Sequence, residues 1–392
     1  MRRLLPPALV ETFPVVLLRS LSVGDFRNLA QVELRPSPAA TVVVGPNGQG
    51  KTNLLEAVYF LCTLRPLRAA KLSDLVRFGA SSGFVCGTFT LHGADRTIRV
   101  EIRDGARVAL VDGKRAAALL DYFGGVSVVA FTPDDLEVVK GGPEQRRWFL
   151  DRAVFNRFPA YLDESREYAR ALKSRNRLLK ERAGGEYLAA FDGALVKAGT
   201  RLWVRRRALM TELAPRAERA FAAIGRADQP ARYTYAPSHL GTLAFDTATE
   251  AELAEAFTLE LGRRLERDLE RGFTSVGPHA DDLGLFLGER SARAFASQGQ
   301  QRAVVLAWKI AEIENLHDAH GALPLLLLDD VSSELDPERN AYLMGYLAES
   351  GAQTFLTTTD AGLVRRAAGP DALWFSVQRG AVEALEHHQF PR

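Results

Sequence analysis

The segment VVVGPNGQGKTNLLEAV, Val42 to Val58, decides the fold of this 392-residue chain. An apolar, β-branched run enters it and a helix-like pattern leaves it. Between them, residues 45–52 satisfy G-x-x-x-x-G-K-[ST], in which glycines let backbone N–H groups surround phosphate oxygens at a helix N-terminus. Strand, loop and helix in this order predict an α/β nucleotide-binding core, whereas a glycine turn without a ligand is the alternative.

Each residue type in this loop has an expected role. Lys51 reaches the β- and γ-phosphates, and the Thr52 hydroxyl holds Mg²⁺. ATP and Mg²⁺ are therefore the predicted cofactors. The predicted nucleotide-binding residues are Gly45, Pro46, Asn47, Gly48, Gln49, Gly50, Lys51, Thr52 and Asn53.

A second segment, LPLLLLDDVSSELD, supplies the carboxylates that such a site needs. It reads as a buried strand that ends in Asp329 and Asp330. We expect Asp329 to hold the metal and Asp330 to polarise the attacking water as general base. The alternative is a pair of helix-capping aspartates, which the phosphate loop makes less attractive.

Most of the chain separates Lys51 from Asp329, so an inserted domain is expected between them. The periodicity is strand-like before about residue 131, helical from about residue 143 to 271, and strand-like again afterwards. The predicted fold is α/β, with a mixed-sheet phosphate-loop core, an antiparallel β subdomain and an inserted all-helical lobe. The expected parts are a leader 1–14, a first head part 15–140, the helical lobe 141–271 and a second head part 272–392.

The stretch SQGQQ begins a strongly helical segment just before the metal strand. A serine hydroxyl, a glycine N–H and a helix N-terminus together form a second anion site. An ordinary serine N-cap is the alternative. The order of phosphate loop, insertion, S-x-G-Q helix and Asp-Asp strand is more specific than any of its parts.

With these motifs in order, the chain resembles the ABC-type ATPase heads of the SMC/Rad50 kind and, among them, the bacterial RecF family. The resemblance rests on LRSLSVGDFRNL, VVVGPNGQGKTNLLEAVYFL, FTPDDLEVVKGGPEQRRWFLDRAV, TSVGPHADDL, SQGQQR and LLLLDDVSSELD. It implies that two heads enclose ATP, so that the signature residues Ser297, Gly299 and Gln300 contact nucleotide bound by the partner chain. It also implies that Ser333 and Asp336 belong to a D-loop crossing the same interface.

Three departures from the family pattern are visible. Asp330 stands where such heads usually carry Glu, and Thr357, Thr358 and Thr359 occupy the region that usually supplies a switch His. The segment FTPDDLEVVKGG, where a Q-loop is expected, contains no Gln. The first two departures suggest slow hydrolysis, and the Q-loop role stays unassigned.

Charge is concentrated in the helical region. Residues 140–207 hold 17 Lys/Arg and 8 Asp/Glu, although the whole chain carries only +2. Such a local excess favours a polyanionic partner, and no base-reading motif is present, so backbone contacts to DNA are expected. A solvated helix face is the alternative. The predicted DNA contacts are Arg146, Arg147, Arg170, Lys173, Arg175, Arg177, Arg205 and Arg206.

Weaker signals are left open. Arg27 and Asn28 either approach the adenine or ribose or form a strand turn, and His279 either lines a functional face or is satisfied by its neighbours. Cys62 and Cys86 are read as reduced thiols. No run is long enough to span a bilayer and no signal peptide is recognised, so a cytoplasmic protein is expected.

By resemblance, the chain is expected to be an ATP-dependent recombination mediator with weak, DNA-stimulated ATPase activity. Such a protein dimerises on ATP, binds duplex DNA beside single-stranded gaps, and acts in DNA repair, replication and the SOS response. Its expected partners are RecR, RecO in the same pathway, and RecA, which it helps to load. The alternative is the ATPase subunit of an ABC membrane transporter, against which stand the basic insertion and SQGQQ in place of LSGGQ.

Overall fold

The structure, a computed structural model, describes residues 16–68, 71–91, 93–116, 122, 126–182, 184–224 and 229–385. Internal contacts divide the chain into two compact units. Unit 1 comprises residues 1–136 and 312–392, and unit 2 comprises residues 137–311. The expected leader, residues 1–14, lies outside the described residues.

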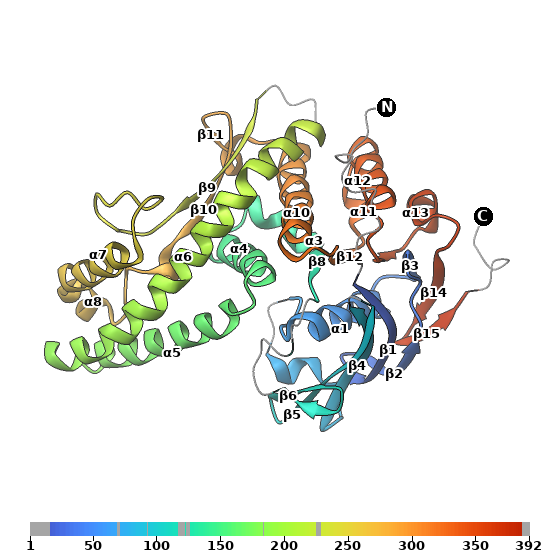
Figure 1. Ribbon diagram of the computed structural model, residues 1–392, viewed down its shortest axis with the longest axis horizontal. Helices are drawn as coiled ribbons and strands as arrows, with labels where there is room; N and C mark the ends of the chain where they lie inside the picture. Colours follow the sequence, from blue (N-terminus) through green and yellow to red (C-terminus); the bar gives the residue numbers. More distant parts are fainter. Residues whose placement is uncertain are drawn as a thin grey trace. The chain divides into compact units, whose positions relative to one another are not determined.

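A largely parallel sheet forms the centre of unit 1 (Figure 1). In spatial order its strands are β15 (Ala381–Ala384), β14 (Leu373–Gln378), β3 (Ala40–Val44), β13 (Thr354–Thr358), β12 (Leu325–Asp329) and β8 (Val128–Phe131). Only the β14–β15 pair in this sheet is antiparallel. β12 and β13 are buried along their whole length, as expected for apolar runs in a parallel sheet covered on both faces.

The helices of unit 1 connect and cover these strands. They are α1 (Lys51–Thr63), α3 (Pro133–Leu136), α11 (Val331–Glu334), α12 (Pro337–Ser350) and α13 (Ala361–Ala368). α1 contacts the parallel sheet at β12 and β13 and also contacts β4 (Ser82–Leu91). Because α1 lies between two sheets, it is buried from Leu54 to Thr63 and carries no polar outer face.

An antiparallel sheet forms the other side of unit 1, as the alternating sequence pattern predicts. Its order is β2 (Leu29–Leu34), β1 (Leu17–Phe26), β4, β5 (Ala94–Arg103), β6 (Ala106–Val111) and β7 (Lys114–Arg115). Every second residue of β4 is buried, so one face of the sheet packs inward. The Asp104–Gly105 and Asp112–Gly113 turns have positive φ throughout, as two-residue Asp-Gly hairpin turns require.

Helices dominate unit 2. They are α4 (Pro143–Arg157), α5 (Tyr161–Lys180), α6 (Gly185–Ile224), α7 (Glu250–Arg263), α8 (Leu265–Arg271), α9 (Ala292–Phe295) and the first part of α10 (Gln298–His320). α5 and α6 pack against each other as the hairpin seen in Figure 1. The helical periodicity after Pro143 does not show a break, but the helix is interrupted between α4 and α5, because Pro159 disfavours a helical residue before it.

Unit 2 also contains a small antiparallel sheet, in the order β11 (Arg290–Ser291), β10 (Asp282–Leu287) and β9 (Ala231–Ala236). The prediction that residues 141–271 are all-helical is therefore wrong at β9, where Tyr-rich residues favour a strand. β9 pairs with β10 along its whole length. This pairing groups residues after 271 with unit 2, whereas the sequence placed them in the head.

Aromatic packing closes the core of unit 2. The Trp308 ring of α10 lies 5.4 Å from the Phe149 ring of α4 and 5.8 Å from the Tyr233 ring of β9, measured between centroids. The Tyr233 hydroxyl also donates to the Val304 carbonyl at 2.8 Å. The helix that begins with the S-x-G-Q motif is thus anchored to both α4 and the small sheet.

Candidate nucleotide site and basic face

The phosphate loop joins β3 to α1, as the sequence predicts. The Lys51 ammonium folds over the loop and donates to the Gly45 carbonyl at 2.6 Å and the Pro46 carbonyl at 3.1 Å. Burial lowers the pKa of Lys51, while the carboxylates of Asp330 and Asp329 act in the opposite sense. A cation is thus held at the loop with two carboxylates near it, the charge pattern of a phosphate and metal site.

Neighbouring strands hold the loop in shape. Gly50 has φ +119°, a conformation that favours glycine, and a Cβ there would lie 2.7 Å from Asn28 Oδ1. The Asn28 amide donates to the Gln49 carbonyl at 3.0 Å and accepts from Asn53 at 2.8 Å. The Gly380 N–H donates to the same Gln49 carbonyl at 2.9 Å. Asn28 is therefore a support of the loop, a role that the sequence pattern left open.

The Arg27 side chain has a structural partner. Its guanidinium pairs with both carboxylate oxygens of Glu56, at 2.8 and 3.1 Å, and the Glu56 side chain is fully buried. Arg68, which the sequence did not single out, donates to Asn53 Oδ1 at 3.1 Å and lies 3.7 Å from Glu56. The Arg27 contacts favour the strand-turn interpretation over contact with adenine or ribose.

Thr52 and Asp329 meet although most of the chain separates them. Thr52 Oγ1 lies 2.8 and 2.9 Å from the two Asp329 carboxylate oxygens, so the hydroxyl donates to the carboxylate. Burial raises the pKa of Asp329, partly offset by hydrogen bonds from Thr357 and Thr52. A buried carboxylate beside a hydroxyl is a set of hard oxygen donors that fits Mg²⁺.

Thr357 links the two aspartates. Its hydroxyl donates to Asp329 Oδ1 at 2.8 Å and accepts from the Asp330 N–H at 3.0 Å. This arrangement follows from sheet order, because β13 lies between β3 and β12. The sequence identified residues 357–359 only as a region where a switch His is missing. The three threonines alone did not indicate that one of them contacts the aspartates.

Asp330 has the geometry of a functional residue. Its backbone has φ +50°, which is uncommon for a residue with a side chain, and such strain gathers at functional sites. Its Oδ1 is buried and has no hydrogen-bond partner among the described residues. The side chain does not cap α11, which weighs against the capping alternative.

The two D-loop residues have clear local contacts. The Ser333 hydroxyl donates to the Asp330 carbonyl at 2.7 Å. Asp336 caps α12 by accepting from the Arg339 N–H at 3.1 Å, and its carboxylate also pairs with the Arg339 guanidinium. Both contacts fix the segment that follows Asp330.

The S-x-G-Q residues form an exposed helix start in unit 2. The Ser297 hydroxyl accepts from the Gln300 N–H at 3.2 Å, and the Gln300 side chain accepts from the Ser297 N–H at 2.9 Å. This is a reciprocal cap, so the N-cap interpretation holds locally. Ser297 is exposed and Gly299 is partly exposed, so a further anion is sterically able to reach this helix end.

Three of the eight predicted DNA contacts are buried, and for them the prediction is wrong. Arg146, Arg175 and Arg206 are only 7%, 0% and 3% exposed. Each pairs with a carboxylate at 2.7–2.9 Å: Asp282, Asp192 and Asp151, respectively. A buried cation needs such a partner, so these arginines hold unit 2 together and do not face solvent.

The other five residues differ in their availability. Arg170, Lys173 and Arg177 lie on α5 and are exposed. Arg147 donates to the Asp281 carbonyl at 2.7 Å, and Arg205 pairs with Glu164 at 3.1 Å. Counting Lys and Arg along the sequence could not separate the buried, the paired and the exposed basic residues, because burial depends on which helix face packs inward.

His279 is satisfied by its neighbours. Its Nε2 donates to the Thr274 carbonyl at 2.9 Å, so Nδ1 accepts from the Tyr168 hydroxyl at 2.6 Å. Burial lowers the pKa of His279. The neighbouring Asp281 is fully buried and accepts from Trp203 Nε1 at 2.7 Å. The GPHADDL motif is therefore a packing motif of unit 2.

Comparisons with known proteins show the family to which the chain is similar. The family model of the RecF/RecN/SMC N-terminal domain matches residues 17–380. The DNA replication and repair protein RecF of Myxococcus xanthus (strain DK1622) is 67% identical over 367 residues, covering 93% of this chain and 96% of that protein. RecF of Geobacter sulfurreducens is 40% identical over 365 residues, covering 93% and 99%.

Solved structures give the same result. The recombination mediator protein RecF with ATP, from the RecFOR pathway, superposes with TM-score 0.82 at 30% identity, covering 95% of this chain and 100% of that one. An Smc head from Pyrococcus furiosus, at TM-score 0.54 and 16% identity, shares the fold.

None of these matches supports the transporter alternative. In the described part of the chain, no helix combines the length and apolar character needed to cross a membrane. The α/β head with a phosphate loop, the meeting of Thr52 with Asp329, and the matched relatives agree on one assignment. The chain belongs to the RecF family of DNA replication and repair proteins.

Proposed function

We propose that this chain is an ATP-hydrolysing recombination mediator whose two copies join around ATP on DNA. The contact between Thr52 and Asp329 carries the proposal, because it brings together, from two distant motifs, hydroxyl and carboxylate oxygens that suit Mg²⁺ beside the phosphate loop. The similarity to RecF proteins, one of them solved with ATP in the RecFOR pathway, supports the same activity.

Each residue of the site has a chemical task. The phosphate loop and Lys51 bind the β- and γ-phosphates, and Thr52 with Asp329 would hold Mg²⁺, which supplies charge stabilisation when bound. Asp330 accepts the proton of the attacking water as general base. The Thr357 hydroxyl donates to the Asp329 carboxylate and accepts from the Asp330 backbone N–H, so Thr357 orients the first carboxylate and fixes the backbone that bears the second.

The other half of the site comes from a second copy. By similarity to its family, Ser297, Gly299 and Gln300 deliver a helix N-terminus to the γ-phosphate, while Ser333 and Asp336 lie at the same interface. A positive helix end supplied in trans stabilises the transition state only in the dimer. Hydrolysis is slow and depends on dimer formation.

DNA binds on the exposed face of the α5–α6 hairpin. This face carries Arg170, Lys173, Arg177, Lys180 and Lys197. It is hollowed by a cavity of about 450 Å³ whose lining includes Arg170, Ser174 and Lys197. Cations beside a shallow groove suit phosphate oxygens, so the contacts read DNA form and not base sequence.

The cellular role follows from the family. The protein acts in the cytoplasm on duplex DNA beside single-stranded gaps, in DNA repair, replication and the SOS response. Its protein partners are RecR, with RecO in the same pathway, and it promotes the loading of RecA. The DNA-bound dimer is the form with the higher ATPase rate.

The decisive experiment measures the ATPase rate per chain at several protein concentrations, with and without gapped duplex DNA. We expect the rate to rise with protein concentration and with DNA. The Asp330→Asn variant, which keeps the phosphate loop, serves as the control for contaminating ATPases. A rate independent of concentration and of DNA would refute the proposed dimeric, DNA-gated enzyme.

A second experiment tests the DNA face. The double variant Lys173→Glu with Arg177→Glu is compared with Arg103→Glu with Lys114→Glu, which changes exposed cations of unit 1. Only for the first pair do we expect weaker duplex binding, with a log–log salt slope that is smaller by about 0.9 for each phosphate no longer neutralised. Equally weakened binding by both pairs would show that general charge, not α5, governs binding.

A further inference from the structure

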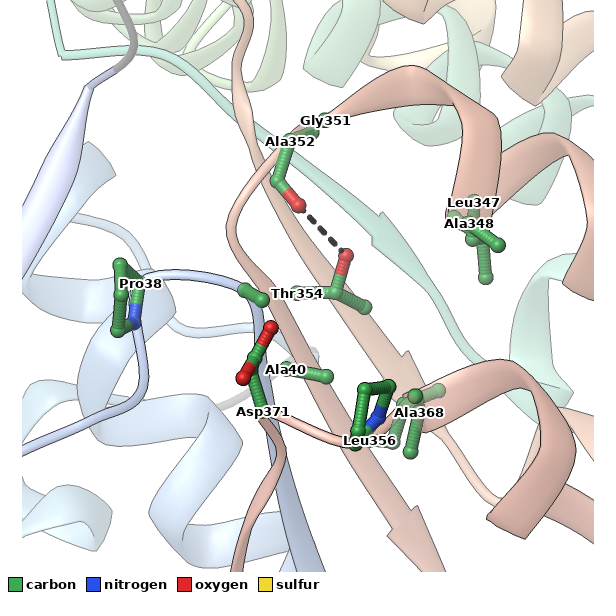
Figure 2. Close-up of a pocket in the computed structure, with 13 residues that line it drawn as sticks. Pro38, Ala40, Leu347, Ala348, Gly351, Ala352, Thr354, Leu356, Ala368 and Asp371 are labelled. Carbon is green, nitrogen blue, oxygen red and sulfur yellow. Dashed lines mark hydrogen bonds between the residues drawn. The ribbon is translucent and has the colours of Figure 1, made fainter.

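Unit 1 contains a cavity of about 530 Å³ that is separate from the nucleotide site (Figure 2). Ala40, the first residue of β3, and Thr354, the first residue of β13, both line it. The phosphate loop leaves β3 after Val44, at the opposite end of the strand. At about 3.3 Å per residue, β3 alone separates the two sites by about 13 Å.

Small side chains keep this cavity open. Its walls include Ala40, Ala348, Ala352 and Ala368, together with Leu347 and Leu356. Of these, only Ala348 is exposed. The inner wall is therefore apolar and buried, whereas Ala348 and Gly351 are among the exposed lining residues, and the hollow is large enough for an apolar side chain.

The lining of the cavity carries one acidic side chain and the C-termini of two helices. α12 ends at Ser350 and α13 ends at Ala368, and residues at both helix C-termini, where the helix dipole is negative, line the cavity. Figure 2 shows the Asp371 carboxylate turned toward the hollow. The Ser37 hydroxyl donates to the Asp371 carbonyl at 2.9 Å and fixes its backbone. The described residues that line the cavity include no Lys, Arg or His.

We propose that this cavity docks a partner protein through an apolar side chain that is flanked by Lys or Arg. An apolar anchor in a desolvated pocket is the usual centre of a protein interface. The acidic side chain and the helix C-termini select a basic neighbour and repel nucleic-acid phosphates. This docking site goes beyond the proposed ATPase function and does not depend on it.

The probe is a fluorescein-labelled hexapeptide, Gly-Arg-Leu-Leu-Arg-Gly, titrated with the full chain by fluorescence anisotropy. We expect saturable binding that weakens about tenfold when Glu replaces both Arg or Ala replaces both Leu. Equal binding of the Glu-containing peptide would overturn the proposal, as would the absence of saturable binding up to about 1 mM.

Variants locate the binding. Ala348→Trp fills the cavity from an exposed lining position and Asp371→Lys reverses the charge of its acidic side chain, so each should weaken binding of the hexapeptide at least tenfold. Glu383→Lys makes the same charge change at an exposed position of β15 and should leave binding unaltered. ATP binding by all three variants is measured separately as the check on folding.

Two further results would overturn the proposal. One is equal affinity of the hexapeptide for all variants that bind ATP. The other concerns the segment MRRLL at residues 1–5, which has the same basic and apolar chemistry. If only a variant lacking residues 1–15 binds the hexapeptide, the cavity belongs to this segment and not to a partner protein.

Discussion

At the scale of single residues, the buried carboxylate of Asp329, which the proposed metal site needs, lowers the stability of the fold. Burial raises its pKa, so the folded protein holds this proton more tightly than the unfolded chain. The carboxylate therefore lowers the free energy of unfolding as pH rises from its ordinary pKa of about 4 to the raised value. Above that interval the full destabilisation is present, and at acidic pH it vanishes.

We predict that Asp329→Asn raises the midpoint of thermal unfolding of the nucleotide-free protein at pH 7. The amide oxygen still accepts from Thr52 and Thr357, but no buried charge remains. Calorimetry at several pH values should show this gain shrinking toward about pH 4. In the same variant, ATP hydrolysis should fall at least about 100-fold, as expected when a charge-stabilising group is removed.

The matched control is Asp104→Asn, at a carboxylate that is 88% exposed in a turn with φ +51°. Asn tolerates this backbone conformation, so neither stability nor hydrolysis should change. If Asp329→Asn proves less stable than the parent at pH 7, or if its gain increases on acidification, the assigned cause of the pKa shift is wrong.

Arg175 is a buried charged residue with a structural role. Its guanidinium is fully buried between Asp192, at 2.7 Å, and the equally buried Asp268, at 3.1 Å. Arg175→Ala leaves Asp268 uncompensated, so we predict a loss of about 3–5 kcal/mol in the free energy of unfolding by urea.

Arg177 lies on the same helix, two positions along, and is 72% exposed. Arg177→Ala should therefore change the free energy of unfolding by less than about 0.5 kcal/mol. A similar loss for both variants would contradict the division between structural and exposed arginines.

At the scale of elements, the phosphate loop depends on a neighbouring turn. Asn28 follows β1 and binds both Gln49 and Asn53, so the loop conformation is set before nucleotide arrives. We predict that Asn28→Ala weakens ATP binding about tenfold, the effect of removing hydrogen bonds worth about 1.4 kcal/mol. Titration with a fluorescent ATP analogue measures this change.

Gln31→Ala, at an exposed position of β2, is the control for general disturbance of the antiparallel sheet. It should leave nucleotide affinity unchanged. If Asn28→Ala binds the analogue as tightly as the parent, the loop keeps its shape without this support and the element-level argument fails.

At the scale of the whole molecule, the phosphate loop and the S-x-G-Q helix start lie in different units. Lys51 and Asp329 belong to unit 1, and Ser297 belongs to unit 2. In the proposed dimer, Ser297 acts on the nucleotide of a second copy. The rate should then depend on how chains combine, and not on each chain alone.

We predict that Lys51→Ala and Ser297→Arg are each nearly inactive alone, and that their mixture regains activity. In a mixed two-fold dimer one site is intact, so an equal mixture should reach about one quarter of the parental rate. Thermal unfolding of both variants controls for loss of the Ser297 cap. If the mixture stays as inactive as its components, the trans assignment of Ser297 is incorrect.

The order of helices and strands was largely predictable, because short-range sequence patterns determine it. The parallel strands, α1 and the Asp-Gly hairpins all follow from apolar periodicity and turn residues within short windows. The break at Pro159 and the strand β9 were missed. Both lie within a helical stretch, where the general periodicity masked one proline and one short Tyr-rich run.

The sequence by itself determined the family and the phosphate-loop core, and it predicted the roles of the two aspartates and of the signature helix. These features are contiguous motifs, so neighbouring residues along the chain already specify their chemistry. Only the tertiary structure decided that Thr357 bridges the two aspartates, that Asn28 supports the loop, and that Arg175 is buried. Those facts depend on strand order and on which helix face packs inward, and both are set by long-range packing.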